Sequence, residues 1–325
     1  MCEAMFWDRW PRCGLNGARK RTRTSKILRS LVPETSASTN SAIRAFSKRF
    51  RLIKESLRFG NYINKEGAGK IPPRPYIPLC MKILLLIWLV LTLAGPLWMY
   101  LSGKVDLKSD YRTANRESAH LAPDPARQRE AVIQVYAARA FNWRGIFATH
   151  CWISVKPKDA EAYMVYQVVG WRAYQGLPAL SIAQDAPDRY WYNQKPKIIL
   201  DIRGEKAQAL IPRIDAAARA YPDAKLYTLW PGPNSNTFPA YVAREVPELG
   251  LALPSDAIGK DYAKNVLFAK TPSGTGYQFN LWGLFGFLIA AKEGIEINIL
   301  GLVYGIKFYP FALLLPGIGE ASTSI

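Results

Sequence analysis

The stretches GIFATHCWISV (residues 145–155) and YMVYQVVGW (residues 163–171) decide which kind of domain this chain forms. Both are rich in aromatic and β-branched residues, which favour strands. The sequence KPKD at residues 156–159 lies between them and is typical of a turn. Together the three segments predict an antiparallel hairpin. Residues 131–139 are apolar-rich and predict a strand before it.

Two helices are predicted to follow the hairpin. Residues 203–221 place apolar side chains at helical spacing. The sequence WPGPNSNTF (residues 230–238) combines a rigid turn with good N-cap residues, so a helix to about Val246 should follow it. This succession predicts an α/β (α+β) fold class for residues 131–320, with an antiparallel sheet and packed helices.

The C-terminal region is strongly apolar. Residues 279–291 contain no charge over 13 positions, and IEINI (residues 295–299) alternates strictly between apolar and polar side chains. The pattern predicts a second hairpin with one polar face. Three placements of this hairpin stay open, namely a buried sheet, contact with a membrane surface, and insertion into the bilayer, although the run is too short to span it comfortably.

A single transmembrane helix is predicted before the domain. Residues 83–101 (ILLLIWLVLTLAGPLWMYL) carry no charge and lie between Lys82 and Lys104. A helix of this length spans about 28 Å, close to the thickness of the hydrocarbon layer. The alternative is a buried core helix, which the distribution of charge disfavours.

The charge distribution also predicts the orientation of the chain. Residues 1–80 hold 17 Lys/Arg and five Asp/Glu, which is +12 of the net charge of +18. By the positive-inside tendency, this tail lies in the cytoplasm. The domain then lies on the periplasmic or extracytoplasmic side of the cell inner membrane, as a single-pass protein.

The tail itself is predicted to be mostly disordered. A short amphipathic piece at residues 41–59 is suited to resting on anionic lipid. Met81 and Lys82 also resemble a start followed by a signal-anchor helix over residues 81–103, which would make the tail an upstream extension.

The linker and the cysteines limit the chemistry of the chain. Residues 104–130 predict a polar linker with a loose helix, in which His120 is solvated. Only Cys151, of four cysteines, lies beyond the membrane segment, so the domain cannot form an internal disulfide. No Cys and His cluster has metal-ligand spacing, and neither a metal nor a cofactor is expected. The expected partners are membrane lipid, through Ile83 to Leu101, and an envelope substrate. No motif indicates specific nucleic-acid binding.

Three residues form the candidate catalytic site. They are His150 on a strand, Gln167 on the paired strand, and Ser235 at the start of a helix. A helix N-terminus offers free N–H groups that can stabilise an oxyanion. A serine nucleophile needs a base such as histidine, and Gln167 would hold the imidazole in one tautomer. Each residue also has a structural interpretation, as a core histidine, an ordinary strand residue and an N-cap.

Several unusual stretches occur in an order that resembles a known bacterial family. They are AVIQVYAARAFNWRGIFATHCWISVKP, YMVYQVVGW, PDRYWYNQKP, WPGPNSNTF and EGIEINILGL. Over about residues 110–320 the chain resembles the family catalogued as domain of unknown function 3750. The name of that family implies no activity.

A more distant similarity concerns the order of the three candidate residues. Histidine on a first strand, a polar residue on the next, and then a nucleophile opening a helix is the order in circularly permuted papain-like proteins. The lecithin retinol acyltransferase and NlpC/P60 groups are examples, and their nucleophile motif resembles Asn-Cys-x-x-Phe. Here residues 234–238 read NSNTF, so Ser235 stands where the cysteine is expected. Because a serine is far less acidic, the similarity implies either a weak serine hydrolase or an inactive scaffold.

The sequence therefore suggests a membrane-anchored hydrolase or acyltransferase. It would act on an amide or ester in peptide, peptidoglycan or lipid, with Asn234 and Asn236 binding the ligand rather than only forming the turn. The alternatives are an inactive papain-like scaffold that binds an envelope ligand or protein, and a structural protein whose C-terminal hairpin rests on lipid.

Overall fold

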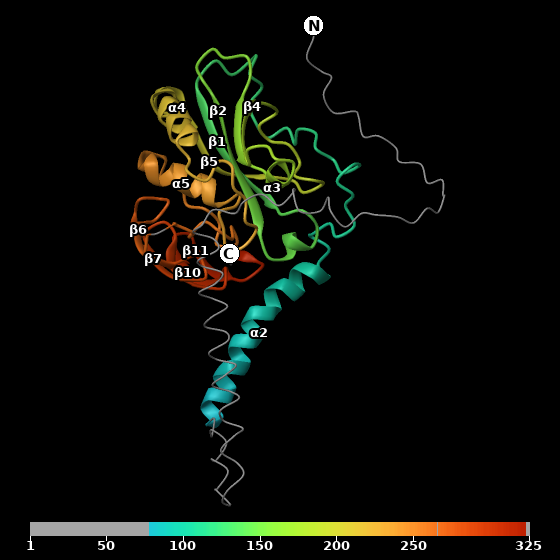
Figure 1. The fold of residues 1–325 in the computed structure, drawn as a ribbon, viewed down its shortest axis with the longest axis vertical. Coiled ribbons are helices and arrows are strands. Elements are labelled where there is room, and N and C mark those ends of the chain that lie inside the picture. The colour runs from blue at the N-terminus through green and yellow to red at the C-terminus, as the bar shows by residue number, and fades with distance from the viewer. Residues whose placement is uncertain (1–77, 265, 323–325) are drawn as a thin grey trace, which may run out of the picture. The chain divides into compact units, whose positions relative to one another are not determined.

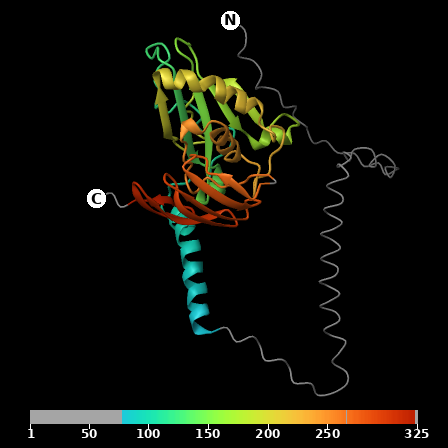
Figure 2. The same ribbon diagram turned by 90° about the vertical axis from the view of Figure 1, so that its left-hand side faces the viewer.

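A computed structural model describes residues 78–264 and 266–322 of the chain. These residues belong to one compact unit (Figures 1 and 2). The amphipathic segment predicted at residues 41–59 lies outside the described residues.

A long apolar helix precedes the domain. Helix α2 runs Leu79–Leu101 and begins after Pro78, whose backbone is extended. It is long and apolar enough to cross a membrane, and most of its large apolar side chains are exposed. Its buried residues, Gly95, Pro96 and Met99, lie in its C-terminal half. The helix thus has the length and composition predicted for a membrane anchor.

The first sheet has five antiparallel strands in the order β4-β3-β2-β1-β5. The strands are β1 (Val132–Arg139), β2 (Thr149–Lys156), β3 (Met164–Val168), β4 (Leu180–Gln184) and β5 (Lys197–Arg203). The predicted hairpin of β2 and β3 is confirmed, with Ile153 opposite Tyr166. Both strands are shorter than predicted, because the 3-10 helix η1 (Asn142–Ile146) precedes β2 and helix α3 (Gly170–Tyr174) follows β3.

One face of the first sheet carries the main hydrophobic core. Helices α4 (Gly204–Arg219) and α5 (Thr237–Glu245) pack on this face, which confirms both predicted helices (Figures 1 and 2). A short 3-10 helix, η2 (Pro247–Leu249), follows α5. Alternate side chains of β1 and β2 share this core with Ile214 of α4 and Phe238 of α5.

The opposite face of the first sheet is covered by irregular chain. The predicted loose helix does not form between residues 104 and 130. Instead this segment is hydrogen-bonded along residues 187–194, and the Asp188 carboxylate accepts from the N–H groups of Leu121 and Ala122. A smaller apolar cluster lies beneath it, made of Tyr136, Ala138, Trp152 and Val165 with Leu121, Trp191 and Ile198 packed against them.

The second sheet is an antiparallel meander of seven strands in the order β12-β11-β10-β9-β8-β7-β6. The strands are β6 (Phe268–Lys270), β7 (Gly276–Leu281), β8 (Phe285–Ala290), β9 (Gly294–Ile299), β10 (Leu302–Phe308), β11 (Phe311–Leu315) and β12 (Gly319–Ala321). The predicted second hairpin is confirmed as β8 and β9. The uncharged run 279–291 also includes the end of β7, because a turn after Leu281 divides it.

The two faces of the second sheet differ in polarity. One face, called here the outer face, is aliphatic or aromatic throughout β7 to β11. It carries Tyr277, Phe279, Leu281, Phe285, Phe287, Ile289, Ile295, Ile297, Ile299, Leu302, Tyr304, Ile306, Phe308, Phe311, Leu313 and Leu315, and many of these are exposed. The other face is buried and includes the polar residues Gln278, Asn280, Glu296 and Asn298. The predicted polar face therefore points into the protein.

Candidate functional site

His150 lies near the start of β2 and is buried. Its imidazole shares a sheet face with Trp152, because alternate strand residues point the same way. The ring stacks on Trp191 with 3.6 Å between ring centroids and an angle of 11° between planes. The Nε2 atom has no hydrogen-bond partner among the described residues. An unsatisfied buried nitrogen is unusual and marks this position for a functional explanation.

The surroundings of His150 determine its protonation. Burial lowers the pKa of His150 to about 3, and an interaction with the Gln167 side chain opposes this shift. The ring is therefore neutral at physiological pH and can accept a proton at one nitrogen. Gln167 lies on β3 and is half-buried. His150 and Gln167 therefore lie on neighbouring strands of the first sheet, and their catalytic roles stay a prediction.

The loop before α5 is attached to β2 on both sides of His150. The Asn236 amide accepts a hydrogen bond from the backbone N–H of Cys151 at 3.1 Å. The same amide donates to the carbonyl of Thr149 at 2.9 Å. Because these two groups flank His150 along one edge of β2, the residue after Ser235 is held directly beside the histidine. The pairing of β2 with β3 ends at Ile153, and beyond that point Asn236 provides the hydrogen bonds to this edge of β2.

Asn234 holds the loop from the other end. Its side-chain oxygen accepts from the N–H groups of Asn236 at 2.9 Å and Thr237 at 3.3 Å. Its amide nitrogen donates to the carbonyls of Leu229 and Ile258, each at 3.1 Å. Both amides predicted to bind a ligand are thus engaged in the fold, and their ligand-binding role stays a prediction. Two N–H groups at the start of α5 are also occupied, which reduces the oxyanion site expected there.

A glycine allows this close packing. Gly259 has a positive φ of 98°, and a Cβ atom at this position would collide with the Asn234 amide. Only glycine adopts this backbone conformation without strain and leaves the space free. The loop that carries Ser235 is therefore fixed from three directions, by β2, by Leu229 and by residues 258–259.

Ser235 precedes the helix rather than opening it. Helix α5 begins at Thr237 with Asn236 as its N-cap residue. Ser235 is 8% exposed, and no hydrogen bond joins its hydroxyl to the described residues, His150 included. Its hydroxyl is therefore not used as an N-cap acceptor, which was the structural interpretation of this serine.

An aromatic wall extends from His150 towards solvent. Trp191 stacks on Trp171 with 5.6 Å between ring centroids, and Tyr192 contacts both rings edge-on. Trp171 is 38% exposed, so the wall reaches the surface. The contact of this wall with His150 depends on the folding of residues 187–194 across β2.

A buried ion pair lies at the start of β2 and was not predicted from sequence. Asp256 accepts from the Arg139 guanidinium at 3.0 Å, and its backbone carbonyl accepts from Thr149 N–H. Burial raises the pKa of Asp256, and the charge of Arg139 opposes that shift. The Arg139 guanidinium also donates to the carbonyls of Gly317 and Ile318. This contact connects β1 of the first sheet with the turn before β12 of the second.

Comparison with known proteins identifies one family. A family model described as "Protein of unknown function (DUF3750)" matches residues 130–262. The matched segment contains the first sheet, α4, α5 and all the candidate residues. No curated protein and no solved structure matches the chain.

Proposed function

We propose a function from the premise that residues 130–262 of this chain belong to the DUF3750 family, whose description names no activity. The protein is a membrane-anchored hydrolase or acyltransferase that acts on an amide or ester. Ser235 is the nucleophile, His150 is the general base, and Gln167 orients the imidazole.

The attachment of Asn236 on both sides of His150 carries this proposal. It fixes the loop that carries Ser235 to the backbone of β2 on both sides of His150, whose imidazole is neutral. The chain order of base, orienting residue and nucleophile matches that of circularly permuted papain-like proteins. The Nε2 atom of His150 has no hydrogen-bond partner among the described residues, which supports a role for this nitrogen in accepting a proton.

The proposed reaction has two halves. The Ser235 hydroxyl oxygen attacks the substrate carbonyl carbon while its proton passes to the His150 ring. The carbon–nitrogen or carbon–oxygen bond then breaks, and the leaving amine or alcohol takes that proton. Water, or an acceptor hydroxyl in a transferase, attacks the resulting ester and gives its proton to His150. Ser235 leaves with that proton, which restores the starting state.

The anchor gives the setting of the reaction. We propose that helix α2 contacts membrane lipid through Ile83 to Leu101, and the excess of cations before it supports a periplasmic location of the domain. The substrate is then a peptide, peptidoglycan or lipid of the cell envelope. The aromatic wall from Trp171 to His150 suits an apolar or ring-shaped substrate group.

A second candidate is an inactive scaffold that binds an envelope ligand or protein. Two observations favour it. Serine stands at the position where the related motif has cysteine, and Asn234 occupies two N–H groups that would otherwise stabilise an oxyanion.

Labelling of the full chain in lipid vesicles with a serine-directed fluorophosphonate separates the two candidates. A hydrolase should be labelled, and Ser235→Ala and His150→Ala should each abolish the label. Ser255→Ala is the matched control, since Ser255 is also buried and should not affect labelling. In Ser235→Cys, the new thiol should react with iodoacetamide faster than the buried Cys151. Labelling that persists in Ser235→Ala contradicts the assignment of the nucleophile. A folded natural chain that is never labelled supports the binding role.

A further inference from the structure

The second sheet has an apolar outer face and an inner face that includes buried polar side chains. Along β8, Phe285, Phe287 and Ile289 point outward, and Gly286, Leu288 and Ala290 point inward. In a sheet that faces water on one side, the apolar residues point to the core instead. No charged residue lies on the outer face of β7 to β11. Such a large continuous apolar surface marks a contact with another phase or molecule.

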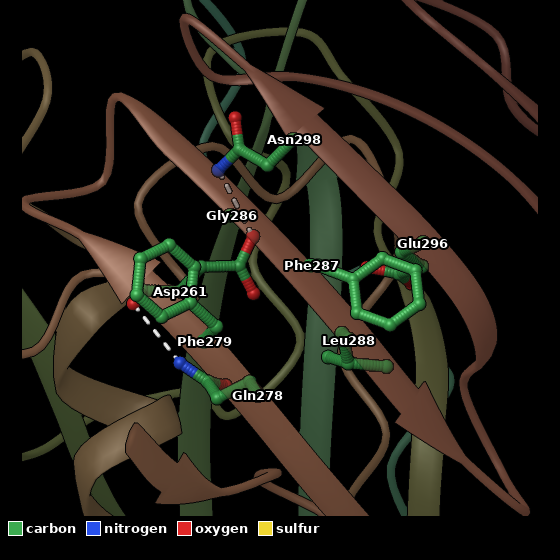
Figure 3. Close-up of a pocket in the computed structure, with 8 residues that line it drawn as sticks. All are labelled: Asp261, Gln278, Phe279, Gly286, Phe287, Leu288, Glu296 and Asn298. Atoms are coloured by element: carbon green, nitrogen blue, oxygen red, sulfur yellow. Dashed lines mark hydrogen bonds between the residues drawn. The ribbon is translucent and has the colours of Figure 1, made fainter. Parts of the chain in front are cut away.

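The inner face shows that this reversal is built into the fold. Asn298 donates to the Asp261 carboxylate at 3.2 Å, and Gln278 donates to the Asp261 carbonyl at 3.1 Å (Figure 3). Lys260 is buried between Asp261 and Glu296 and pairs with both. The polar inner side chains therefore have specific partners. The sheet cannot be turned over without leaving these groups unpaired in a place where water is excluded.

Figure 3 also shows the two kinds of residue around one small pocket. Phe279 and Phe287 of the outer face line it together with Asp261, Glu296 and Asn298, and the Phe287 ring lies in front of Glu296 in this view. The pocket is at Gly286, which has no side chain to fill it. Aromatic rings of the outer face thus separate the carboxylates of Asp261 and Glu296 from the surroundings of that face.

Helix α2 lies against this same surface. The hydroxyls of Thr92 and Tyr304 are hydrogen-bonded at 2.6 Å, and Tyr304 belongs to the outer face. A Cβ atom at Gly95 would collide with the Pro316 carbonyl oxygen, so the helix backbone touches the turn after β11. The outer face and the middle of α2 are therefore in direct contact.

The length of the helix places this contact within the bilayer. From Lys82, the first charge before the apolar run, to Thr92 the helix is about 15 Å long. The hydrocarbon layer is about 30 Å thick. If Lys82 lies at one surface of a bilayer that α2 crosses, Thr92 and the outer face next to it lie inside the hydrocarbon. An apolar face suits that position, whereas a polar one would not.

We infer that the outer face of the second sheet is embedded in the lipid leaflet on the domain side of the membrane, so that the protein holds the bilayer through a sheet as well as a helix. The ligand of this surface is lipid acyl chain. Contact of this kind requires no catalytic activity and applies equally to an inactive scaffold. It adds a second membrane-contacting element to the anchor and keeps the domain at a fixed depth and orientation.

Spin labels on the full chain, reconstituted in phosphatidylcholine and phosphatidylglycerol vesicles, test this contact. Labels are attached to Phe287→Cys and Ile297→Cys in a chain whose other reactive cysteines are changed to serine (Cys2, Cys13 and Cys80), leaving the buried Cys151. Both labels should collide with oxygen, which dissolves in lipid, more often than with a water-soluble nickel complex. Tyr174→Cys, in α3 beside the first sheet, is the matched control; Tyr174 is 79% exposed, and its label should show the opposite preference.

A label at Leu84 on α2 distinguishes failure of the sheet contact from failure of the anchor. If Leu84→Cys is in lipid while Phe287→Cys and Ile297→Cys meet the nickel complex as often as Tyr174→Cys does, the sheet contact is wrong. If each sheet label, carried alone in its chain, is shielded from both reagents and shows spin–spin broadening, a second copy of the chain covers the face and lipid does not. If Leu84→Cys is itself in water, both membrane contacts are wrong. Circular dichroism of each variant verifies that it is folded.

Discussion

The two sheets of this protein use the same alternation of side chains in opposite directions. The first sheet turns its apolar residues towards α4 and α5 and covers its other face with the segment 104–130. The second sheet turns apolar residues outward and pairs its polar residues inside. Strand periodicity determines that two faces exist, and the neighbours of each face decide which one is buried.

The difference follows from what lies beside each sheet. The first sheet has two amphipathic helices available, and burying a large apolar side chain against them contributes about 1.5–3 kcal/mol. The second sheet packs its inner face on a loop rich in charged residues, including Lys260 and Asp261. Its outer face contacts α2 through Tyr304 and β11. Four experiments with substituted chains would break or sharpen the comparison.

Loss of Lys260 should have the largest effect. Lys260→Ala leaves the carboxylates of Asp261 and Glu296 buried without their cation, which should lower the free energy of unfolding by about 3–5 kcal/mol. Urea denaturation in micelles, monitored by tryptophan fluorescence, measures this change in the free energy of unfolding. Arg219→Ala removes an exposed pair with Asp215 and is the control, with an expected loss of at most about 1 kcal/mol. Equal losses of stability in both variants would mean that the buried ion pairs of Lys260 do not stabilise the inner face of the second sheet.

An isoleucine from each sheet gives a direct comparison. Ile153→Ala creates a cavity in the first core and should lower the free energy of unfolding by about 2–5 kcal/mol. Ile297→Ala, on the outer face, should cost less than about 1 kcal/mol in the same urea titration, because lipid or detergent refills the space. A larger loss for Ile297→Ala would indicate that the outer face is packed against protein.

The bridge beside His150 should contribute less than the cores. Asn236→Ala leaves the Thr149 carbonyl and the Cys151 N–H without their partner, which should cost about 1–3 kcal/mol. It should also abolish fluorophosphonate labelling at Ser235, because the loop loses its attachment to β2. Stability is measured by urea titration and labelling by gel fluorescence. A stable variant that is still fully labelled would remove the role given to this asparagine.

The buried histidine should make stability depend on pH. Its folded-state pKa of about 3 lies below its ordinary value of 6.5, so the unfolded chain binds the proton more readily. The contribution of His150 to stability is complete above pH 6.5 and is lost progressively as the pH falls towards 3. Between pH 7 and pH 5 the natural chain should lose about 1–2 kcal/mol more than His150→Phe. Urea midpoints at the two pH values measure this difference, and parallel curves for both chains would contradict it.

The same pKa has a consequence for catalysis. If His150 is the base, it stays neutral at every pH well above 3. The acid limb of a pH–rate profile should therefore lie far below the value of 6.5 typical of an exposed histidine.

Much of the local structure followed from sequence patterns. The apolar run after Lys82, the hairpin of β2 and β3, and the helices α4 and α5 were all predicted, because each has a clear period or a clear stop signal. The boundaries were less accurate. Residues 142–146 and 170–174 form short helices where strands were expected to begin and end, since aromatic residues such as Trp171 suit either structure.

The candidate site was predicted in part. His150 and Gln167 lie on the neighbouring strands β2 and β3, as predicted, and their catalytic roles stay a prediction. The amides of Asn234 and Asn236 hold the loop that carries Ser235, and the ligand-binding role expected for them stays a prediction. The stacking of Trp191 on His150 and the Arg139–Asp256 pair were not predicted, since they join residues 41 and 117 positions apart.

Sequence by itself determined the periodic features of this protein: an uncharged run long enough for a bilayer, strands that alternate, and helices with one apolar face. Only the tertiary structure decided which face of the second sheet points outward. It also decided that the Asn236 side chain bridges the β2 backbone on either side of His150. The physical reason is that periodicity is a property of consecutive residues. The choice of face and of partner depends on contacts between distant segments and on the medium, water or lipid, that each surface meets.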